Sequence, residues 1–116
     1  MSSPNAAHDE RAAKIRAAND SLRRTMPHGQ VVLSQLVADL DPPLVLEIVK
    51  VVRAFDAFTP DNDPCGEHDF GRVLVRGEAY FWKIDAYDLN LEWGSPDAAD
   101  EAVTKRIITI MTPSDL

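Results

Sequence analysis

The sequence has few of the features that mark a secreted or membrane protein. It contains one cysteine in 116 residues, so it cannot form an internal disulfide. No apolar run approaches the roughly 20 residues that a bilayer-spanning helix needs, and residues 1–24 contain no continuous apolar stretch of the kind found in signal peptides. We therefore expect a cytoplasmic protein that is not embedded in a membrane.

Basic residues are scarce relative to acidic ones. Twelve Lys and Arg residues stand against 19 Asp and Glu residues, which gives a formal net charge of −7. Residues 54–100 hold eleven acids and three bases, whereas residues 1–24 hold three acids and five bases. A protein that binds nucleic acids or anionic membranes nonspecifically needs clustered Lys and Arg residues on its surface. The charge thus argues against direct binding to either, and we expect a charged partner to be a basic protein.

The apolar content, at 45%, is sufficient for one hydrophobic core. We expect a single domain over residues 25–116, preceded by an N-terminal helix within residues 1–24 that docks loosely. Residues 6–24 are rich in alanine and arginine, which favour helix. Because Ile15, Ala18 and Leu22 form only a thin apolar stripe, this helix should dock by a narrow face.

The strongest helical pattern begins at Asp41, a plausible N-cap, followed by Pro42 in the first turn. Its apolar positions recur at steps of three and four residues, and they are Leu44, Ile48, Val51, Phe55 and Phe58. Pro60 should end the pattern because the residue before a proline is disfavoured in a helix. This segment is the predicted central helix of the core.

A β-hairpin is predicted around Gly77 and Glu78, which suit a type II′ turn with glycine in its first central position. In that register Val73 faces Trp82. Alternation then predicts one buried face, made of Val73, Val75, Tyr80, Trp82 and Ile84. The opposite face carries a mixture of apolar and charged side chains, namely Leu74, Phe81, Arg72, Lys83 and Asp85.

Further strands are predicted at residues 31–33 and 106–111, which are rich in β-branched residues, and one short helical turn between Ser95 and Val103. The predicted fold class is α+β, a small, mainly antiparallel sheet of three or four strands with helices packed on one face.

The segment DNDPCGEHDF, residues 61–70, concentrates the potential chemistry of the chain. A catalytic interpretation uses a thiol, a base and neighbouring carboxylates, from Cys65, Glu67, His68 and Asp69. A metal-binding interpretation uses Asp61, Asp63, Cys65 and His68, but the sequence has no second Cys or His pair at ligand spacing. We favour a third interpretation, a charged connection whose aspartates cap turns, with no catalytic residue, metal or cofactor.

Several ordered blocks of sequence carry a resemblance to a known family. They are NDPCGEHDFG at 62–71, FWKIDAYD at 81–88, EWGSPDAAD at 92–100 and RIITIM at 106–111. Over these blocks the chain resembles a bacterial family catalogued as domain of unknown function 3768, from about Val31 to the C-terminus. The resemblance implies no activity. The members of this family are small proteins of proteobacterial genomes and plasmids, so the resemblance implies accessory or mobile-element biology.

The charge distribution predicts a small, acidic, noncatalytic protein-binding or inhibitor module that targets a basic, nucleic-acid-binding protein. The family resemblance implies that the module is of mobile-element origin. Partner contacts are expected from exposed carboxylates and a tryptophan beside a glycine, at Asp61, Asp63, Glu67, Asp88, Glu92 and Trp93. Two alternatives stay open. One is a metal- or cysteine-dependent enzyme centred on residues 61–70, and the other is a regulatory homo-oligomer in which a second copy covers the face with Leu74 and Phe81.

Overall fold

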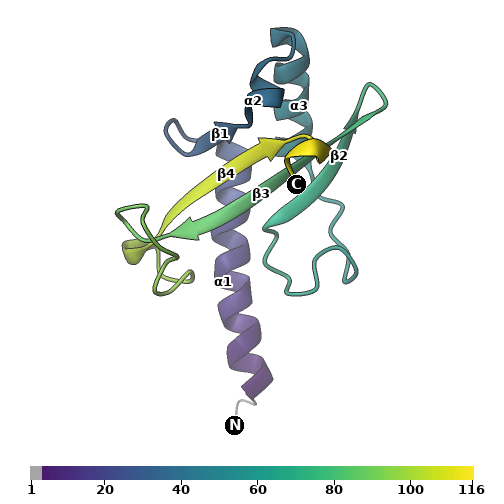
Figure 1. Cartoon of the computed structure of the whole chain (residues 1–116). Coiled ribbons are helices and arrows are strands. Elements are labelled where there is room, and N and C mark those ends of the chain that lie inside the picture. Colours follow the sequence, from purple (N-terminus) through teal and green to yellow (C-terminus); the bar gives the residue numbers. More distant parts are fainter. Residues whose placement is uncertain (1–3) are drawn as a thin grey trace.

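The structure, a computed structural model, describes residues 4–116 and contains one four-stranded mixed sheet. The strands are β1 (Val31–Leu33), β2 (Phe70–Val75), β3 (Glu78–Tyr87) and β4 (Lys105–Met111). They are ordered β1-β4-β3-β2, with β1 parallel to β4 and the other two pairings antiparallel. The strands predicted at 31–33 and 106–111 are confirmed (Figure 1).

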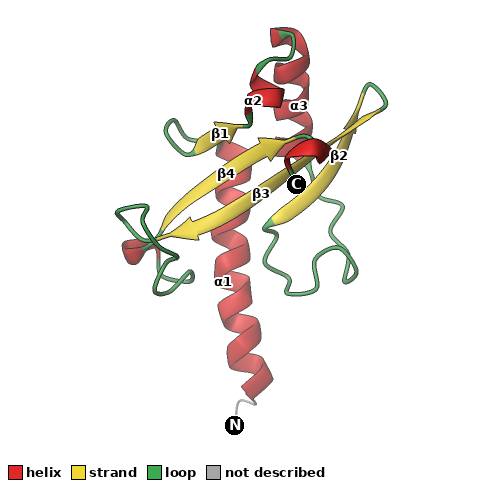
Figure 2. Cartoon of the chain, viewed as in Figure 1, coloured by secondary structure: helices red, strands yellow, loops and turns green. Residues whose placement is uncertain are grey.

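Helices pack against one face of this sheet. They are α1 (Pro4–Thr25), α2 (Gln35–Ala38) and α3 (Pro42–Ala54), and Figure 2 shows α1 running behind the strands. Two single 3₁₀ turns follow, η1 (Glu101–Val103) and η2 (Pro113–Asp115). The predicted α+β class, with a mainly antiparallel sheet and helices on one face, is confirmed. The helical turn expected between Ser95 and Val103 is present only as η1.

The core lies between the helices and the inner face of the sheet. Trp82, Ile108 and Ile110 are fully buried there against Ile48 and Val52 of α3. The helix predicted from Asp41 ends at Ala54, earlier than expected, because Phe55 adopts an extended backbone. Phe55 and Phe58 nevertheless pack edge-on against Trp82, with ring centroids 5.6 and 6.1 Å away.

The β2–β3 hairpin has the predicted faces but a different register. Arg76 and Gly77, not Gly77 and Glu78, occupy the central positions of the turn, and both have positive φ (52° and 81°). Two positive φ angles are the requirement of a type I′ turn. Val73 therefore pairs with Tyr80 rather than Trp82. Because the shift is two residues, every side chain keeps its predicted face, and Val73, Val75, Tyr80, Trp82 and Ile84 are all buried.

Helix α1 crosses the back of the sheet and projects beyond it at its N-terminal end (Figure 1). Its second half is packed tightly, since Ile15 and Leu22 are buried together with two polar residues, Asn19 and Arg23. The guanidinium of Arg23 lies over the rings of Phe58 and Trp82, 5.2 and 5.1 Å from their centroids. A narrow apolar stripe was expected on this helix, but the buried face also includes an arginine and an asparagine.

Candidate functional site

Two long connections lie at the end of the sheet where α1 projects, one on each side of the helix (Figure 1). Residues 55–69 join α3 to β2, and residues 88–104 join β3 to β4. Arg16 of α1 donates to the carbonyl oxygen of Gly66 in the first connection, at 2.9 Å. Arg11 pairs with Asp97 in the second, at 3.4 Å. α1 thus contacts both connections, although the exposed Arg11–Asp97 pair contributes little stability.

The second connection begins with a tight loop at residues 88–93, which we call the Trp93 loop. Its two ends are closed by the bridge between Tyr87 and Gly94 and by a hydrogen bond from the Asp88 N–H to the Trp93 carbonyl, at 2.9 Å. One carboxylate oxygen of Asp88 accepts from the N–H groups of Asn90 and Glu92, at 3.1 and 3.0 Å. This is the local capping for which aspartate is favoured in turns. The loop is therefore a closed, hydrogen-bonded turn.

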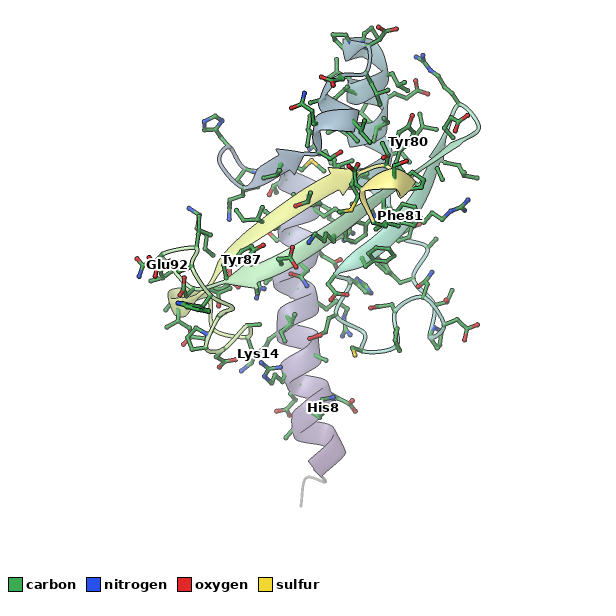
Figure 3. The ribbon with its side chains drawn as sticks, viewed as in Figure 1. His8, Lys14, Tyr80, Phe81, Tyr87 and Glu92 are labelled. Carbon is green, nitrogen blue, oxygen red and sulfur yellow. The ribbon has the colours of Figure 1, made fainter. Side chains whose placement is uncertain are left out.

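The Trp93 loop presents large apolar side chains to solvent. Trp93 is 75% exposed, Leu89 61% and Leu91 50%. Leu91 has a φ of 59°, an unfavourable conformation for leucine, and its N–H bonds to the Asp88 carbonyl oxygen at 3.1 Å. Figure 3 shows Glu92 of the same loop at the outer margin of the molecule. Three exposed apolar groups beside two carboxylates form a cluster of the kind used in protein interfaces.

The first connection contains the acidic loop, residues 61–69, which is fixed to α1. Asn19 donates to the carbonyl oxygen of Glu67 at 2.9 Å, and the Nδ1 atom of His68 lies 2.9 Å from a carboxylate oxygen of Asp20. The Nε2 atom of His68 lies 3.5 Å from Asp63, whose side chain is only 6% exposed. His68, with a φ of 53°, thus sits between two carboxylates, one from the helix and one from its own loop.

Hydrogen bonding shifts the pKa of Asp20. Burial raises the pKa of this carboxyl, but hydrogen bonds from His68 and Arg23 and their positive charge outweigh that effect. The pKa of Asp20 is therefore lower than its ordinary value, and its ionised form is favoured in the folded protein. Asp20 was absent from the residues predicted from sequence, because nothing in a helical segment indicates which loop will pack against it.

The residues of the catalytic interpretation do not share one site. Cys65 is exposed and borders two hollows, one that it lines with His68 and another that it lines with His8 and Glu67. Asp69 lines neither of these two. Asp69 is an exposed residue overall, yet neighbouring atoms displace water from its carboxylate and raise its pKa, and the nearby charges of Asp63 and Asp85 add to this rise. Glu67 and His68 therefore line different hollows, and neither hollow brings all four side chains together.

The residues of the metal-binding interpretation are not gathered into one site either. Within residues 4–116, no group of three or more His, Cys, Asp and Glu side chains is arranged to hold a metal ion. Asp61 and Cys65 are exposed, whereas Asp63 is turned inward toward His68. The ligands proposed from Asp61, Asp63, Cys65 and His68 are thus divided between surface and interior.

The carboxylates and tryptophan expected to contact a partner are also divided. Asp88, Glu92 and Trp93 lie together in the Trp93 loop, and Asp61 and Glu67 lie in the acidic loop on the other side of α1. Asp63, expected at the surface, instead accepts from the His68 N–H at 3.2 Å and is buried. The partner contacts predicted from the sequence did not include Leu89 and Leu91, although apolar and polar residues alternate in LeuAsnLeuGluTrp.

The comparisons with known proteins place this architecture in a family. The family model described as "Protein of unknown function (DUF3768)" matches residues 33–115, from the end of β1 to η2. The chain belongs to this family. The DUF3768 match includes both connections and the whole sheet except part of β1, and it leaves out α1. No curated protein and no solved structure matches the chain.

No helix in residues 4–116 of this DUF3768 chain combines the length and the apolar character needed to cross a membrane. The helix long enough to do so, α1, carries charged residues along most of its length, among them Arg11, Lys14, Arg16 and Arg23.

Proposed function

We propose that this chain is a small, noncatalytic protein-binding module whose Trp93 loop docks on a basic protein, such as one that binds nucleic acid. The observation that carries the proposal is the 75% exposure of Trp93 in a loop held closed by its own hydrogen bonds. Tryptophan is enriched among the residues that dominate binding energy at protein interfaces.

The fixed backbone of the Trp93 loop favours binding. A loop that is ordered before binding loses less conformational entropy when it docks. Here the Asp88 carboxylate and the Tyr87–Gly94 bridge hold the chain in place. Leu89 and Leu91 extend the apolar contact on the same turn. An exposed apolar cluster that is already ordered supports a docking role over a purely structural one.

The surrounding charge supports a basic partner. Of the acids between residues 54 and 100, only Asp63, Asp85 and Asp97 lie within ion-pair distance of a base in the described part of the chain. Glu92 is exposed in the loop itself. Unpaired surface carboxylates attract a basic protein over roughly 8–10 Å at physiological salt and raise the association rate.

The proposal is tested by capture of a partner from the organism that carries the gene, using the wild-type chain and three variants as bait. We expect Trp93→Ala to lose the captured protein and Glu92→Lys to retain less of it. Leu46→Ala is the matched control, because Leu46 is 65% exposed on α3, outside the loop. The association rate of the purified pair should fall as salt increases. Equal capture by Trp93→Ala and wild type would refute the proposal.

A further inference from the structure

The face of the sheet opposite the helices carries many apolar side chains. Val32, Phe70 and Leu74 point outward from β1 and β2 and are 47%, 40% and 58% exposed. Phe70 stacks on Phe81 of β3, with ring centroids 5.7 Å apart, and Figure 3 shows Phe81 on the side of the sheet away from α1. An antiparallel sheet that faces water normally presents polar residues on that side. This outer face is therefore unusual for a surface that stays solvated.

The same face has a small excess of bases over acids, although the chain as a whole is acidic. Its strand residues include three bases, Arg72, Lys83 and Lys105, and one acid, Asp85, which pairs with Lys83 at 3.0 Å. η2 adds a second acid, Asp115, at one margin, and its carboxylate accepts hydrogen bonds from Ser34 and Thr112, so the face carries three bases and two acids. The formal charge of the entire chain is −7. An apolar surface with a positive excess fits an occupant that is apolar and acidic.

The chain itself displays such an occupant. The Trp93 loop combines Leu89, Leu91 and Trp93 with the carboxylates of Asp88 and Glu92. We infer that the outer face of the sheet is a docking surface for the Trp93 loop of a second copy of this chain. The charge complementarity between the two surfaces favours this occupant over a simple face-to-face pairing, in which two surfaces with an excess of bases would meet.

The geometry requires the loop to come from another molecule. The Trp93 loop continues from the far end of β3 and is closed there by the Tyr87–Gly94 bridge, and Trp93 remains 75% exposed in its own chain (Figure 1). Each copy has one loop and one outer face. A twofold axis therefore allows two equivalent contacts, each loop lying on the partner's sheet. Such a dimer covers both exposed apolar surfaces.

This inference goes beyond the proposed function, because it assigns a second surface and a second occupant. Docking in the dimer would cover Trp93 and so compete with the proposed basic partner. The two proposals are tested by different measurements, since self-association is read from the pure protein and the function from capture of another protein. A result that refutes one proposal therefore does not refute the other.

The first experiment measures the mass of the pure full-length chain by sedimentation equilibrium over a range of concentrations. We expect a reversible monomer–dimer equilibrium whose dissociation constant rises at least tenfold for Trp93→Ala and for Leu74→Asp. Leu46→Ala, at an equally exposed apolar residue of α3, should leave it unchanged. A wild-type chain that stays monomeric at every soluble concentration would overturn the inference, as would a Trp93→Ala chain that dimerises normally.

A mixing experiment separates loop-to-face docking from other dimers. Trp93→Ala retains an intact outer face, and Leu74→Asp retains an intact loop, so a mixture of the two restores one of the two contacts. We expect the mixture to associate more strongly than either variant alone and more weakly than wild type. Circular dichroism of each variant confirms that it is folded. If mixing restores nothing while both variants are folded, the loop does not occupy the face and the inference is wrong.

Discussion

The imidazole ring of His68 lies flat on the phenyl ring of Phe58, with centroids 3.6 Å apart and planes inclined by 4°. The same imidazole contacts Asp20 of α1 through Nδ1, at 2.9 Å. One side chain of the acidic loop thus joins α1 to the segment that follows α3. The contribution of this contact to stability can be measured by single substitutions.

Replacement of His68 by alanine should lower the free energy of unfolding by about 2 kcal/mol, because it removes the stacking on Phe58 and leaves Asp20 with one partner fewer. The measurement is urea denaturation of the purified chain. His28→Ala is the control, since His28 is exposed in the turn before β1 and should change stability by less than about 0.5 kcal/mol. Equal losses in the two variants would mean that His68 is not an anchor.

Asp20 should make stability depend on pH in the acidic range. Its pKa is lower in the folded chain than the ordinary value of 3.8, because the hydrogen bonds from His68 and Arg23 outweigh burial. Its stabilising contribution is therefore complete above the unfolded pKa and is lost as pH falls through the folded pKa. We expect Asp20→Asn to be less stable than wild type at pH 7 and to show a shallower decline between about pH 5 and pH 2. The measurement is the free energy of unfolding of both proteins across that pH range. Parallel curves for wild type and Asp20→Asn would contradict the prediction.

Asp69 should have the opposite effect on the pH dependence of stability. Desolvation and the charges of Asp63 and Asp85 raise its pKa in the folded chain, so ionisation of Asp69 destabilises the fold above that pKa and the penalty disappears as pH falls below the unfolded value. Asp69→Asn should stabilise the chain at pH 7 by about 0.5 kcal/mol after allowance for solvent screening. Asp56→Asn, at another exposed acid, is the matched control in thermal melting. A loss of stability in Asp69→Asn would show that its carboxylate is required.

Gly71 lies directly against the buried indole of Trp82. A Cβ atom at this position would approach the indole Nε1 to 2.4 Å, closer than any real contact. Since Trp82 is fully buried and cannot move aside, Gly71→Ala should destabilise the chain by about 3 kcal/mol. Gly94→Ala offers the comparison, because a Cβ there meets no atom within 4 Å. Denaturant midpoints of the two variants test the prediction, and it is wrong if both resemble wild type.

Much of the fold was predictable because it depends on local patterns of apolar and β-branched residues and on their spacing. Steps of three and four residues indicated the helix around Ile48, and β-branched residues indicated β1 and β4. Alternation correctly separated the buried and outward faces of the hairpin, even though its register was displaced by two residues. The register error has a local cause, because a positive φ at Arg76 is not favoured by its side chain.

The candidate site was predictable only in part. Asp88, Glu92 and Trp93 were identified from charge and from the glycine beside the tryptophan, and the structure places them in one loop. The buried position of Asp63 was not foreseen, because an aspartate in a polar segment is usually solvated. Asn19, Asp20 and Arg23 were missed for a related reason, since polar residues on a helix give no sign of the loop that will cover them.

The sequence by itself determined the fold class, the excess of acid in the middle of the chain and the division of each strand into two faces, because these properties depend on residue type and local spacing. Only the tertiary structure decided that α1 is anchored to the acidic loop through Asp20 and His68, that Leu91 and Trp93 remain uncovered, and that an apolar face of the sheet lies open. Those outcomes depend on contacts between residues far apart in the chain, which local spacing does not encode.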